Sequence, residues 1–294
     1  MSSNEAVTKA VAEKGRIQID DLQVTFGQNG NQVDAVSGVS IHIEPGEFVS
    51  IVGPSGCGKS TLLNAVAGFV KPSGGTLLLD GKAIKGPGAD RGMVFQQYSL
   101  FPWMSVRKNV EFGLKMQRMA SGQRESAART LLGLAGLLAF ENHYPDQLSG
   151  GMRQRVGIVR ALATSPQVLL MDEPFGALDA QTRVVMQEIL TNMWQRFRIS
   201  VLFITHDIDE SIFLSDRVYV MTARPGKIKA EIAIPLPRPR LPEMSTSAEF
   251  LKIREQLHAL IREESLKAMG GELKEGGLSG FGIEVGPEGV GELV

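Results

Sequence analysis

The N-terminal part of the chain alternates apolar and polar residues in short segments. The segments IQIDDLQVTF, VSIHIE and FVSIV, all within residues 17–52, show this period of two. Such alternation predicts strands with one buried face, and the Gly- and Asn-rich residues 27–31 predict a turn between strands. We therefore expect an N-terminal antiparallel β subdomain.

After residue 53 the pattern changes to an alternation of helices and strands. A glycine-rich loop precedes the apolar helical segment TLLNAVAGF, and short apolar strands follow around residues 77–79 and 93–95. Later elements are predicted as helix 151–163, strand 168–171, helix 180–197, strand 201–205, helix 208–214 and strand 217–221. This order predicts an α/β core with a parallel sheet and crossover helices. Residues from about 97 to 165 carry mostly helical signals, so we expect a helical subdomain inserted into the core.

Both ends of the chain differ in composition from this core. The segment PLPRPRLP is typical of a proline-rich linker, and four apolar residues after it share one helical face, namely Phe250, Ile253, Leu257 and Leu260. That helix is either a structural brace or an appendage that regulates the protein or stabilises a dimer. The expected organisation is a tail over residues 1–16, a main domain over 17–235, a linker over 236–247, a helix over 248–269 and a Gly- and Glu-rich flexible tail over 270–294.

The charge and the cysteine content limit which binding partners and which cellular compartment are expected. The 31 Lys and Arg residues against 32 Asp and Glu give a formal net charge of -1, so no nucleic-acid partner is expected. The single cysteine excludes an internal disulfide, and the polar N-terminus lacks the apolar core of a secretory signal, which favours the reducing cytoplasm. The longest apolar run, residues 131–140, is about half the roughly 20 residues of a membrane-spanning helix.

One glycine-rich segment carries the strongest chemical signal. It matches the pattern G-x-x-x-x-G-K-[ST], follows the apolar strand FVSIV and opens a helix. The residues expected to bind a nucleotide there are Gly53, Pro54, Ser55, Gly56, Cys57, Gly58, Lys59, Ser60 and Thr61. Backbone N–H groups of such a loop surround the β- and γ-phosphates of ATP, Lys59 supplies a cation and the Ser60 hydroxyl suits Mg²⁺. The alternative is a glycine turn that binds nothing.

The cysteine of the chain lies inside this loop. A position near a helix N-terminus lowers the pKa of a thiol, so Cys57 is expected to react readily with alkylating reagents when it is exposed. Bound Mg-ATP is expected to shield it.

A second chemical signal is a pair of carboxylates at the end of an apolar strand. Asp172 and Glu173 follow the segment VLLM, and strand ends are where α/β sheets place their chemistry. Asp172 is expected to hold Mg²⁺ directly or through water, and Glu173 to act on the attacking water as general base. The alternative is a solvated acidic turn.

The segment LSGGMRQR, residues 148–155, resembles the signature sequence of ABC-type ATPases. It stands at a helix start upstream of the acidic strand, as it does in that family. Taken alone, Ser149 before Gly150 and Gly151 is also an ordinary helix cap. The resemblance covers about residues 17–235 and implies a P-loop ABC ATPase core.

Four further residues receive a role only from this resemblance. Gln96 looks like the glutamine that contacts the metal and reports to the transporter, and His206 like the histidine that contacts the γ-phosphate. Asp179 ends a loop that in the family crosses to the other subunit, although a helix cap is equally compatible. Phe26 stands where the family stacks an aromatic ring on adenine, often a tyrosine, and is also an ordinary strand residue. Without the resemblance, Gln96 would be a loop amide, and His206 would be a satisfied polar residue after a strand.

An aromatic segment follows Gln96 directly and consists of Tyr98, Leu100, Phe101, Pro102 and Trp103. It suits an interface that receives a coupling helix from a membrane subunit, or it forms the core of the helical subdomain. The segments 100–103, 222–227 and 236–240 resemble the branch of the family that imports nitrate, sulfonate and taurine.

The resemblance therefore implies the ATP-hydrolysing subunit of an importer, with Lys59, Glu173 and His206 as its catalytic residues. ATP and Mg²⁺ are the implied cofactors. Two such subunits, as a homodimer or with a second ABC ATPase, would sandwich ATP between the phosphate loop of one chain and residues 149–151 of the other. Membrane permease subunits would hold the protein at the cytoplasmic face of the inner membrane, and a periplasmic or lipid-anchored solute-binding protein would act indirectly. The rivals are a DNA-repair or translation ATPase, an exporter subunit and a scaffold that only binds nucleotide.

Overall fold

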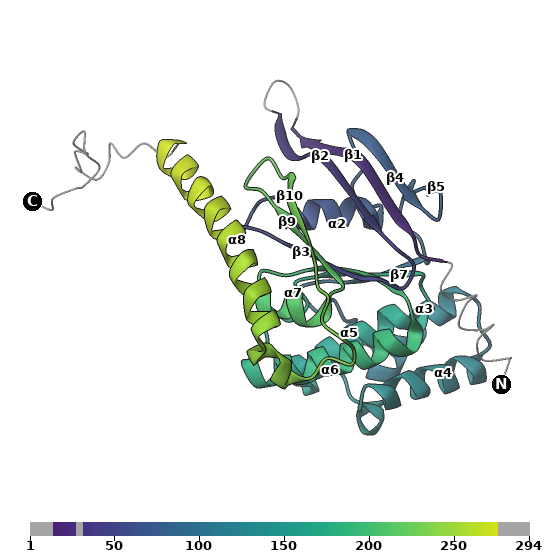
Figure 1. Ribbon diagram of the computed structural model, residues 1–294. Helices are drawn as coiled ribbons and strands as arrows, with labels where there is room; N and C mark the ends of the chain where they lie inside the picture. The colour runs from purple at the N-terminus through teal and green to yellow at the C-terminus, as the bar shows by residue number, and fades with distance from the viewer. Residues whose placement is uncertain (1–13, 28–31, 276–294) are drawn as a thin grey trace, which may run out of the picture.

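Two β-sheets form the scaffold of the protein. The computed structural model describes residues 14–27 and 32–275. The smaller sheet is antiparallel, in the order β2-β1-β4-β5 (Figure 1). Its strands are β1 (Ile17–Phe26), β2 (Val33–Ile43), β4 (Gly74–Leu79) and β5 (Lys82–Ala83). The apolar side chains of β1 are buried, at Ile17, Ile19, Leu22 and Val24. The predicted N-terminal antiparallel sheet is confirmed, whereas residues 28–31 of the predicted turn lie outside the described residues.

The larger sheet has the strand order β10-β9-β3-β8-β7-β6 and is parallel except for β10. Its strands are β3 (Phe48–Val52), β6 (Arg91–Val94), β7 (Val168–Asp172), β8 (Ser200–Ile204), β9 (Arg217–Met221) and β10 (Ile228–Ala233). Every residue of β3 and β8 is buried, as expected for parallel strands covered on both faces. The half-exposed edge strand β10 was not predicted, because its residues lack a buried apolar run.

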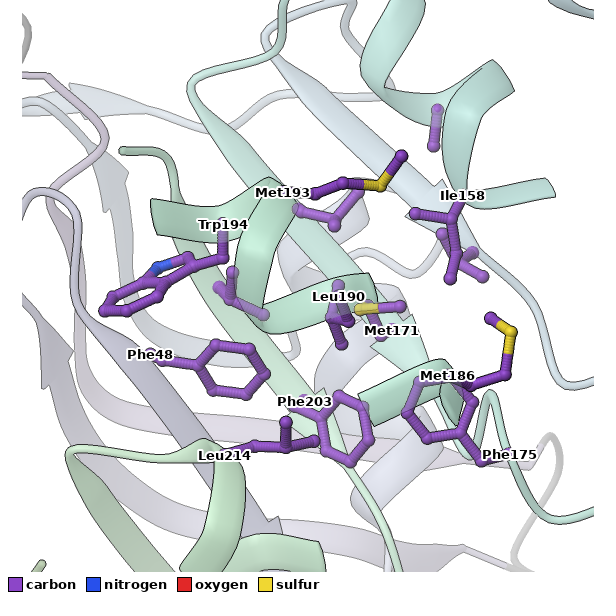
Figure 2. Packing of buried hydrophobic residues seen from close by; sticks show 14 of the residues in the cluster. Phe48, Ile158, Met171, Phe175, Met186, Leu190, Met193, Trp194, Phe203 and Leu214 are labelled. Carbon is purple, nitrogen blue, oxygen red and sulfur yellow. The ribbon is translucent and has the colours of Figure 1, made fainter. Parts of the chain in front are cut away.

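Neighbouring residues of β3 face two separate hydrophobic cores. Val49 and Ile51 pack with the small sheet and with α2 (Lys59–Ala67), while Phe48 packs with the helices on the opposite face. Figure 2 shows the second core, where the ring of Phe48 meets Trp194 edge-on with 6.0 Å between centroids. The large sheet is thus a middle layer between the two hydrophobic cores.

The predicted helical region follows β6 and is confirmed. It contains α3 (Val106–Met116), α4 (Ser121–Leu134) and α5 (Gly150–Ala163), with short 3-10 turns at Leu138–Phe140 and Pro145–Gln147 (Figure 1). Asn109 of α3 is fully buried and binds both the N–H and the carbonyl oxygen of Phe101. This bidentate contact fastens the aromatic segment to the helices.

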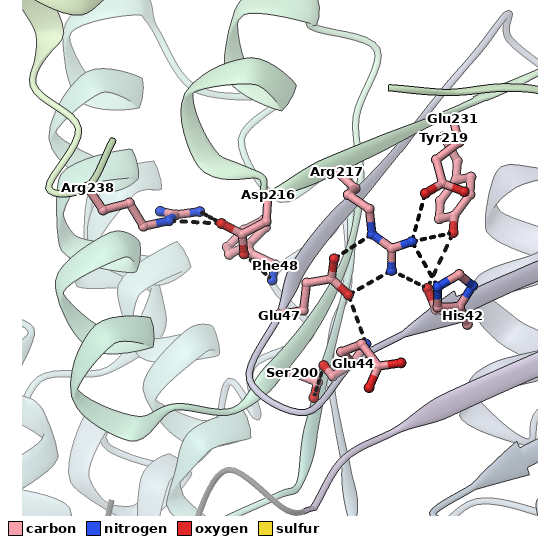
Figure 3. A network of polar contacts seen from close by, with 10 residues as sticks. All are labelled: His42, Glu44, Glu47, Phe48, Ser200, Asp216, Arg217, Tyr219, Glu231 and Arg238. Atoms are coloured by element: carbon pink, nitrogen blue, oxygen red, sulfur yellow. Dashed lines mark hydrogen bonds and ion pairs between the residues drawn. The ribbon is translucent and has the colours of Figure 1, made fainter. Parts of the chain in front are cut away.

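The proline-rich segment packs on the core, although the sequence favoured a linker there. Arg240 is only 5% exposed and donates to three carbonyl oxygens at the C-terminal end of α7 (Ile208–Leu214), which satisfies acceptors that a helix end leaves free. Arg238 forms an ion pair with Asp216 at 2.8 Å, and Asp216 also accepts the N–H of Phe48 at 2.9 Å (Figure 3). These contacts fix the proline-rich segment on the core.

The last element is the long helix α8 (Ala248–Glu275), which runs past its predicted end at residue 269. Its buried face is the predicted one, with Phe250, Ile253 and Leu257 against the core. The rest of the predicted tail, 276–294, lies outside the described residues. Over residues 14–27 and 32–275, none of the helices combines the length and apolar character needed to cross a bilayer.

Candidate functional site

The phosphate-binding loop connects the end of β3 to the start of α2. Gly58 precedes α2 with a φ of 105°, and a Cβ there would lie 2.4 Å from the carbonyl oxygen of Ala35, so the position requires glycine. Lys59 is 6% exposed, and its Nζ donates to the carbonyl oxygens of Gly53 and Pro54 at 2.9 Å each. The ammonium group therefore lies inside the curve of the loop, where phosphate oxygens could replace these carbonyls.

The Ser60 hydroxyl lies beside the carboxylate that ends β7. Ser60 Oγ donates to Asp172 Oδ1 at 2.9 Å. Burial raises the pKa of the Asp172 carboxyl, and the hydrogen bond from Ser60 acts against that rise. A hydroxyl and a carboxylate are hard oxygen ligands, so this pair suits Mg²⁺ next to nucleotide phosphates. Two of the three residues predicted to contact the metal, Ser60 and Asp172, are brought together, whereas Gln96 contacts Glu173.

Three other predicted residues meet around one carboxylate oxygen. Glu173 Oε2 lies 3.2 Å from His206 Nδ1 and 3.5 Å from Gln96 Nε2. The three side chains follow the C-terminal ends of the adjacent strands β7, β8 and β6. Glu173 has a left-handed φ of 42°, and its N–H donates to the carbonyl oxygen of Ile204, so the backbone turns its side chain away from that of Asp172. The cluster is placed for proton transfer to or from a bound water.

Ser149 and Asp179 are both helix caps. Ser149 Oγ accepts the N–H of Met152 at the start of α5, and Asp179 accepts the N–H and the hydroxyl of Thr182 at the start of α6 (Ala180–Phe197). The bonds from Thr182 lower the pKa of the Asp179 carboxyl. Among the described residues, neither side chain hydrogen-bonds to the phosphate loop. Their predicted roles at a second subunit stay predictions.

The glycines of the signature segment are held tightly against neighbouring elements. A Cβ on Gly150 would lie 3.0 Å from the hydroxyl oxygen of Tyr98, and one on Gly151 would lie 2.6 Å from Thr182 Cγ2. Arg153 stacks over the Tyr98 ring, 5.2 Å from its centroid. The aromatic segment after Gln96 and the start of α5 thus form one contact.

The aromatic segment combines a packed and an exposed part. Phe101 packs on Phe112 with 4.7 Å between ring centroids, and Leu100 borders the large core. Trp103, in contrast, is 70% exposed. The packed residues fit the alternative of a subdomain core, and the interface with a membrane subunit stays a prediction.

Cys57 departs from its predicted chemistry. Its side chain is only 1% exposed. Burial raises the pKa of its thiol, and the nearby Lys59 ammonium lowers it by less. The expectation of a thiol with a lowered pKa is wrong, because loss of water around the thiolate outweighs the nearby cation and the backbone N–H groups. Phe26, at the end of β1, is 47% exposed, and its ring is accessible.

The sequence did not indicate a role at this site for two residues, Arg224 and Glu210. Arg224 donates from Nη2 to the carbonyl oxygen of Gly56 at 3.1 Å. Glu210 of α7 is 4% exposed and accepts a hydrogen bond from Thr205, the residue before His206. Burial raises the pKa of Glu210 to about 7. The arginine contact is long-range in sequence, so no local pattern could have revealed it.

Comparisons with known proteins show which proteins this chain resembles. A family model described as "ABC transporter" matches residues 36–176. The chain is 50% identical over 252 residues to the nitrate import ATP-binding protein NrtD of Synechocystis sp., with 84% of this chain and 95% of the relative covered. It is 48% identical over 252 residues to the taurine import ATP-binding protein TauB of Rhizobium johnstonii, with 83% and 96% covered.

Solved structures resemble the fold as well. A dimeric ATP-binding cassette, MJ0796, in a post-hydrolysis state bound to ADP and Pi is 33% identical, with a TM-score of 0.66, and covers 74% of this chain and 98% of its own. The protein cbiO1 from Clostridium perfringens, part of the ABC transporter complex cbiONQ, is 26% identical with a TM-score of 0.68, and covers 86% of this chain and 99% of its own.

Proposed function

Because this chain belongs to the ABC transporter family as an ATP-hydrolysing, ATP-binding subunit, we propose that it powers the import of a small anion such as nitrate, a sulfonate or taurine through partner membrane subunits. The observation that carries the substrate class is the similarity to NrtD and to two TauB proteins, at 43–50% identity over more than four fifths of this chain. The similarity extends through the segments around Trp103 and Arg224 that the sequence associates with this branch.

The chemistry follows from the residues around the phosphate loop. Lys59 exchanges the carbonyls of Gly53 and Pro54 for phosphate oxygens of ATP. Ser60 and Asp172 would hold Mg²⁺, which would neutralise charge on the phosphates.

The carboxylate cluster acts on the water. Glu173 accepts its proton as general base, and His206 orients the Glu173 carboxylate through their contact at 3.2 Å. Gln96 bonds the same oxygen and stands at the start of the aromatic segment, so its position can respond to a partner there.

Each active site is formed by two chains in this proposal. Ser149 and Asp179 are both exposed, and the N-terminus of α5 that follows Ser149 suits a phosphate presented by another molecule. The similar cassette MJ0796 is dimeric in its solved structures. We therefore place residues 149–151 of one chain opposite the phosphate loop of a second ABC ATPase, identical or related.

The membrane partner binds at the aromatic segment. Trp103 is a large apolar side chain left exposed beside packed neighbours, which is typical of an interface anchor. Contact with permease subunits would hold the protein at the cytoplasmic face of the inner membrane, and a solute-binding protein would act through those subunits.

Reconstitution tests the proposal. The chain is combined in proteoliposomes with candidate permease subunits and a solute-binding protein from the same organism, and ATP hydrolysis is measured with nitrate, taurine or an alkanesulfonate. Stimulation by one of these compounds supports the substrate class, and stimulation only by a solute that carries neither a nitrate nor a sulfonate group contradicts it. Trp103→Ala should lower the stimulation and leave basal hydrolysis unchanged. Met116→Ala, a control at another exposed apolar residue of the helical region, should change neither.

A further inference from the structure

The loop over residues 222–227, between β9 and β10, touches the phosphate loop at two points. Arg224 donates from Nε and Nη2 to the Gly56 carbonyl oxygen, at 3.3 and 3.1 Å. Gly226 lies so close that an added Cβ would be 2.2 Å from the carbonyl oxygen of Cys57. The Gly226 N–H also donates to the Ala35 carbonyl oxygen at 3.1 Å, which fixes the loop to β2. These contacts hold the loop against the outer side of the phosphate loop.

The same loop is held from its other side by α8. Glu264 is 2% exposed and accepts the N–H of Ala223 at 3.0 Å. Its second oxygen accepts from Lys229 of β10 at 2.7 Å and from Lys267 at 2.9 Å. Burial alone would raise the pKa of Glu264, but the bonds from Lys229, Lys267 and Ala223 lower it to about 2. The carboxylate is therefore charged throughout the physiological range and fully bonded.

The hydrogen bonds from Arg224 to the Gly56 carbonyl oxygen fix the orientation of the peptide group between Gly56 and Cys57. In a trans peptide the carbonyl and the N–H point in opposite directions. With the Gly56 carbonyl turned out to Arg224, the N–H of Cys57 is turned into the loop, where it lies 3.4 Å from the Pro54 carbonyl oxygen. That carbonyl also accepts from Lys59 Nζ, so the N–H points to the region that phosphate would fill.

We propose that Arg224 is a positioning residue for ATP, and that α8 acts on nucleotide affinity through Glu264, Ala223 and Arg224. The inference depends only on ATP binding by this chain and is independent of the transported solute. A charge-assisted hydrogen bond holds the loop in its binding shape before ATP arrives, so its loss weakens binding without removing a group that acts on the reacting atoms.

The first experiment separates binding from turnover. Arg224→Ala should raise both the Kd and the KM for ATP by about 3- to 10-fold and leave kcat at saturating ATP within about 2-fold, because the lost interaction is uniform in ground and transition states. Arg224→Lys keeps the positive charge but loses the paired guanidinium donors, so its Kd and KM for ATP should lie between those of Arg224→Ala and the wild-type protein. Arg16→Ala removes another exposed arginine, ion-paired with Glu44, and should change none of these values. A Kd for Arg224→Ala within about 2-fold of wild type, with an unchanged melting temperature, would overturn the positioning role.

The second experiment tests the link to α8 with adjacent glutamates. Glu264→Ala removes the acceptor of Ala223, whereas Glu263→Ala removes an exposed partner of the same Lys229 and leaves that acceptor in place. The first should raise the Kd for ATP by roughly 2- to 5-fold and the second should not. In the double variant with Arg224→Ala, the effect of Glu264→Ala should largely disappear, because both act on one contact. If both glutamate variants lower the melting temperature and neither changes the Kd, α8 is only a brace and the link is refuted.

Discussion

Glu210 provides the most quantitative test of the structure, because a buried carboxyl titrates close to neutral pH. Its side chain is 4% exposed and is surrounded by Thr205, Gln187 and the ion pair between Asp207 and Arg183. Burial raises its pKa from 4.5 to about 7, and Thr205 and Gln187 act against that rise. The folded protein therefore binds this proton more tightly than the unfolded chain does.

The sign of the pH dependence follows from linkage. A carboxyl with a raised pKa in the folded state is protonated on both sides of the unfolding equilibrium at low pH, so it does not alter the free energy of unfolding there. Above pH 4.5 the unfolded chain releases the proton first, and the free energy of unfolding falls until the folded carboxyl has also ionised, above about pH 7. At 1.36 kcal/mol for each pKa unit, the total loss is about 3 kcal/mol.

Glu210→Gln isolates this contribution, because glutamine keeps the shape and never ionises. The measurement is equilibrium urea unfolding of the nucleotide-free protein at several values between about pH 5 and pH 8.5. The variant should gain stability relative to wild type as the pH rises, by up to about 3 kcal/mol at the upper end. Glu188→Gln, an exposed glutamate on α6, should show no such trend. A constant difference between Glu210→Gln and wild type over this range would show that Glu210 ionises normally in the folded protein.

Three further predictions concern the nucleotide site. Glu173→Gln should slow ATP turnover by roughly 10²- to 10⁴-fold and leave ATP affinity unchanged. Steady-state hydrolysis and equilibrium binding measure these two quantities. Turnover within a few-fold of wild type would show that Glu173 is not the general base. Ser60→Ala should raise the Mg²⁺ concentration needed for half-maximal hydrolysis by about 10-fold or more, and an unchanged Mg²⁺ titration would contradict the pairing with Asp172. Cys57 should react with maleimide at neutral pH at least about 10-fold more slowly than free cysteine, and a rate close to that of free cysteine would refute its burial.

Much of the fold was predictable because buried parallel strands and amphipathic helices leave local patterns. The helix over Ala180–Phe197 and the strand Arg217–Met221 have the predicted bounds, and the strand ends bring Asp172 and Glu173 to the expected edge. The edge strand β10 was missed because it is half-exposed and has no apolar run to mark it.

The missed features depend on contacts between distant parts of the chain. Arg240 belongs to the segment predicted as a proline-rich linker, yet it is buried on the carbonyls that end α7. The thiol of Cys57 has the local sequence of an activated cysteine, and only the packing around it shows that burial dominates. Arg224, in the loop after β9, reaches Gly56 in the loop after the neighbouring strand β3. Local sequence reports which residues favour an element, whereas burial and tertiary partners determine the chemistry of each side chain.

The central claim is that each ATP site is completed by a second chain, and mixed dimers test it directly. In one preparation, a chain with Lys59→Ala is paired with a chain with Ser149→Arg, so that both lesions fall in one shared site and the other site is intact. In the second preparation, one chain carries both substitutions and its partner is wild type, so each shared site has one lesion. The two chains carry different tags, and ATP hydrolysis of the purified mixed dimers is measured. The proposal predicts faster hydrolysis by the first preparation, and faster hydrolysis by the second would show that each site is built within a single chain.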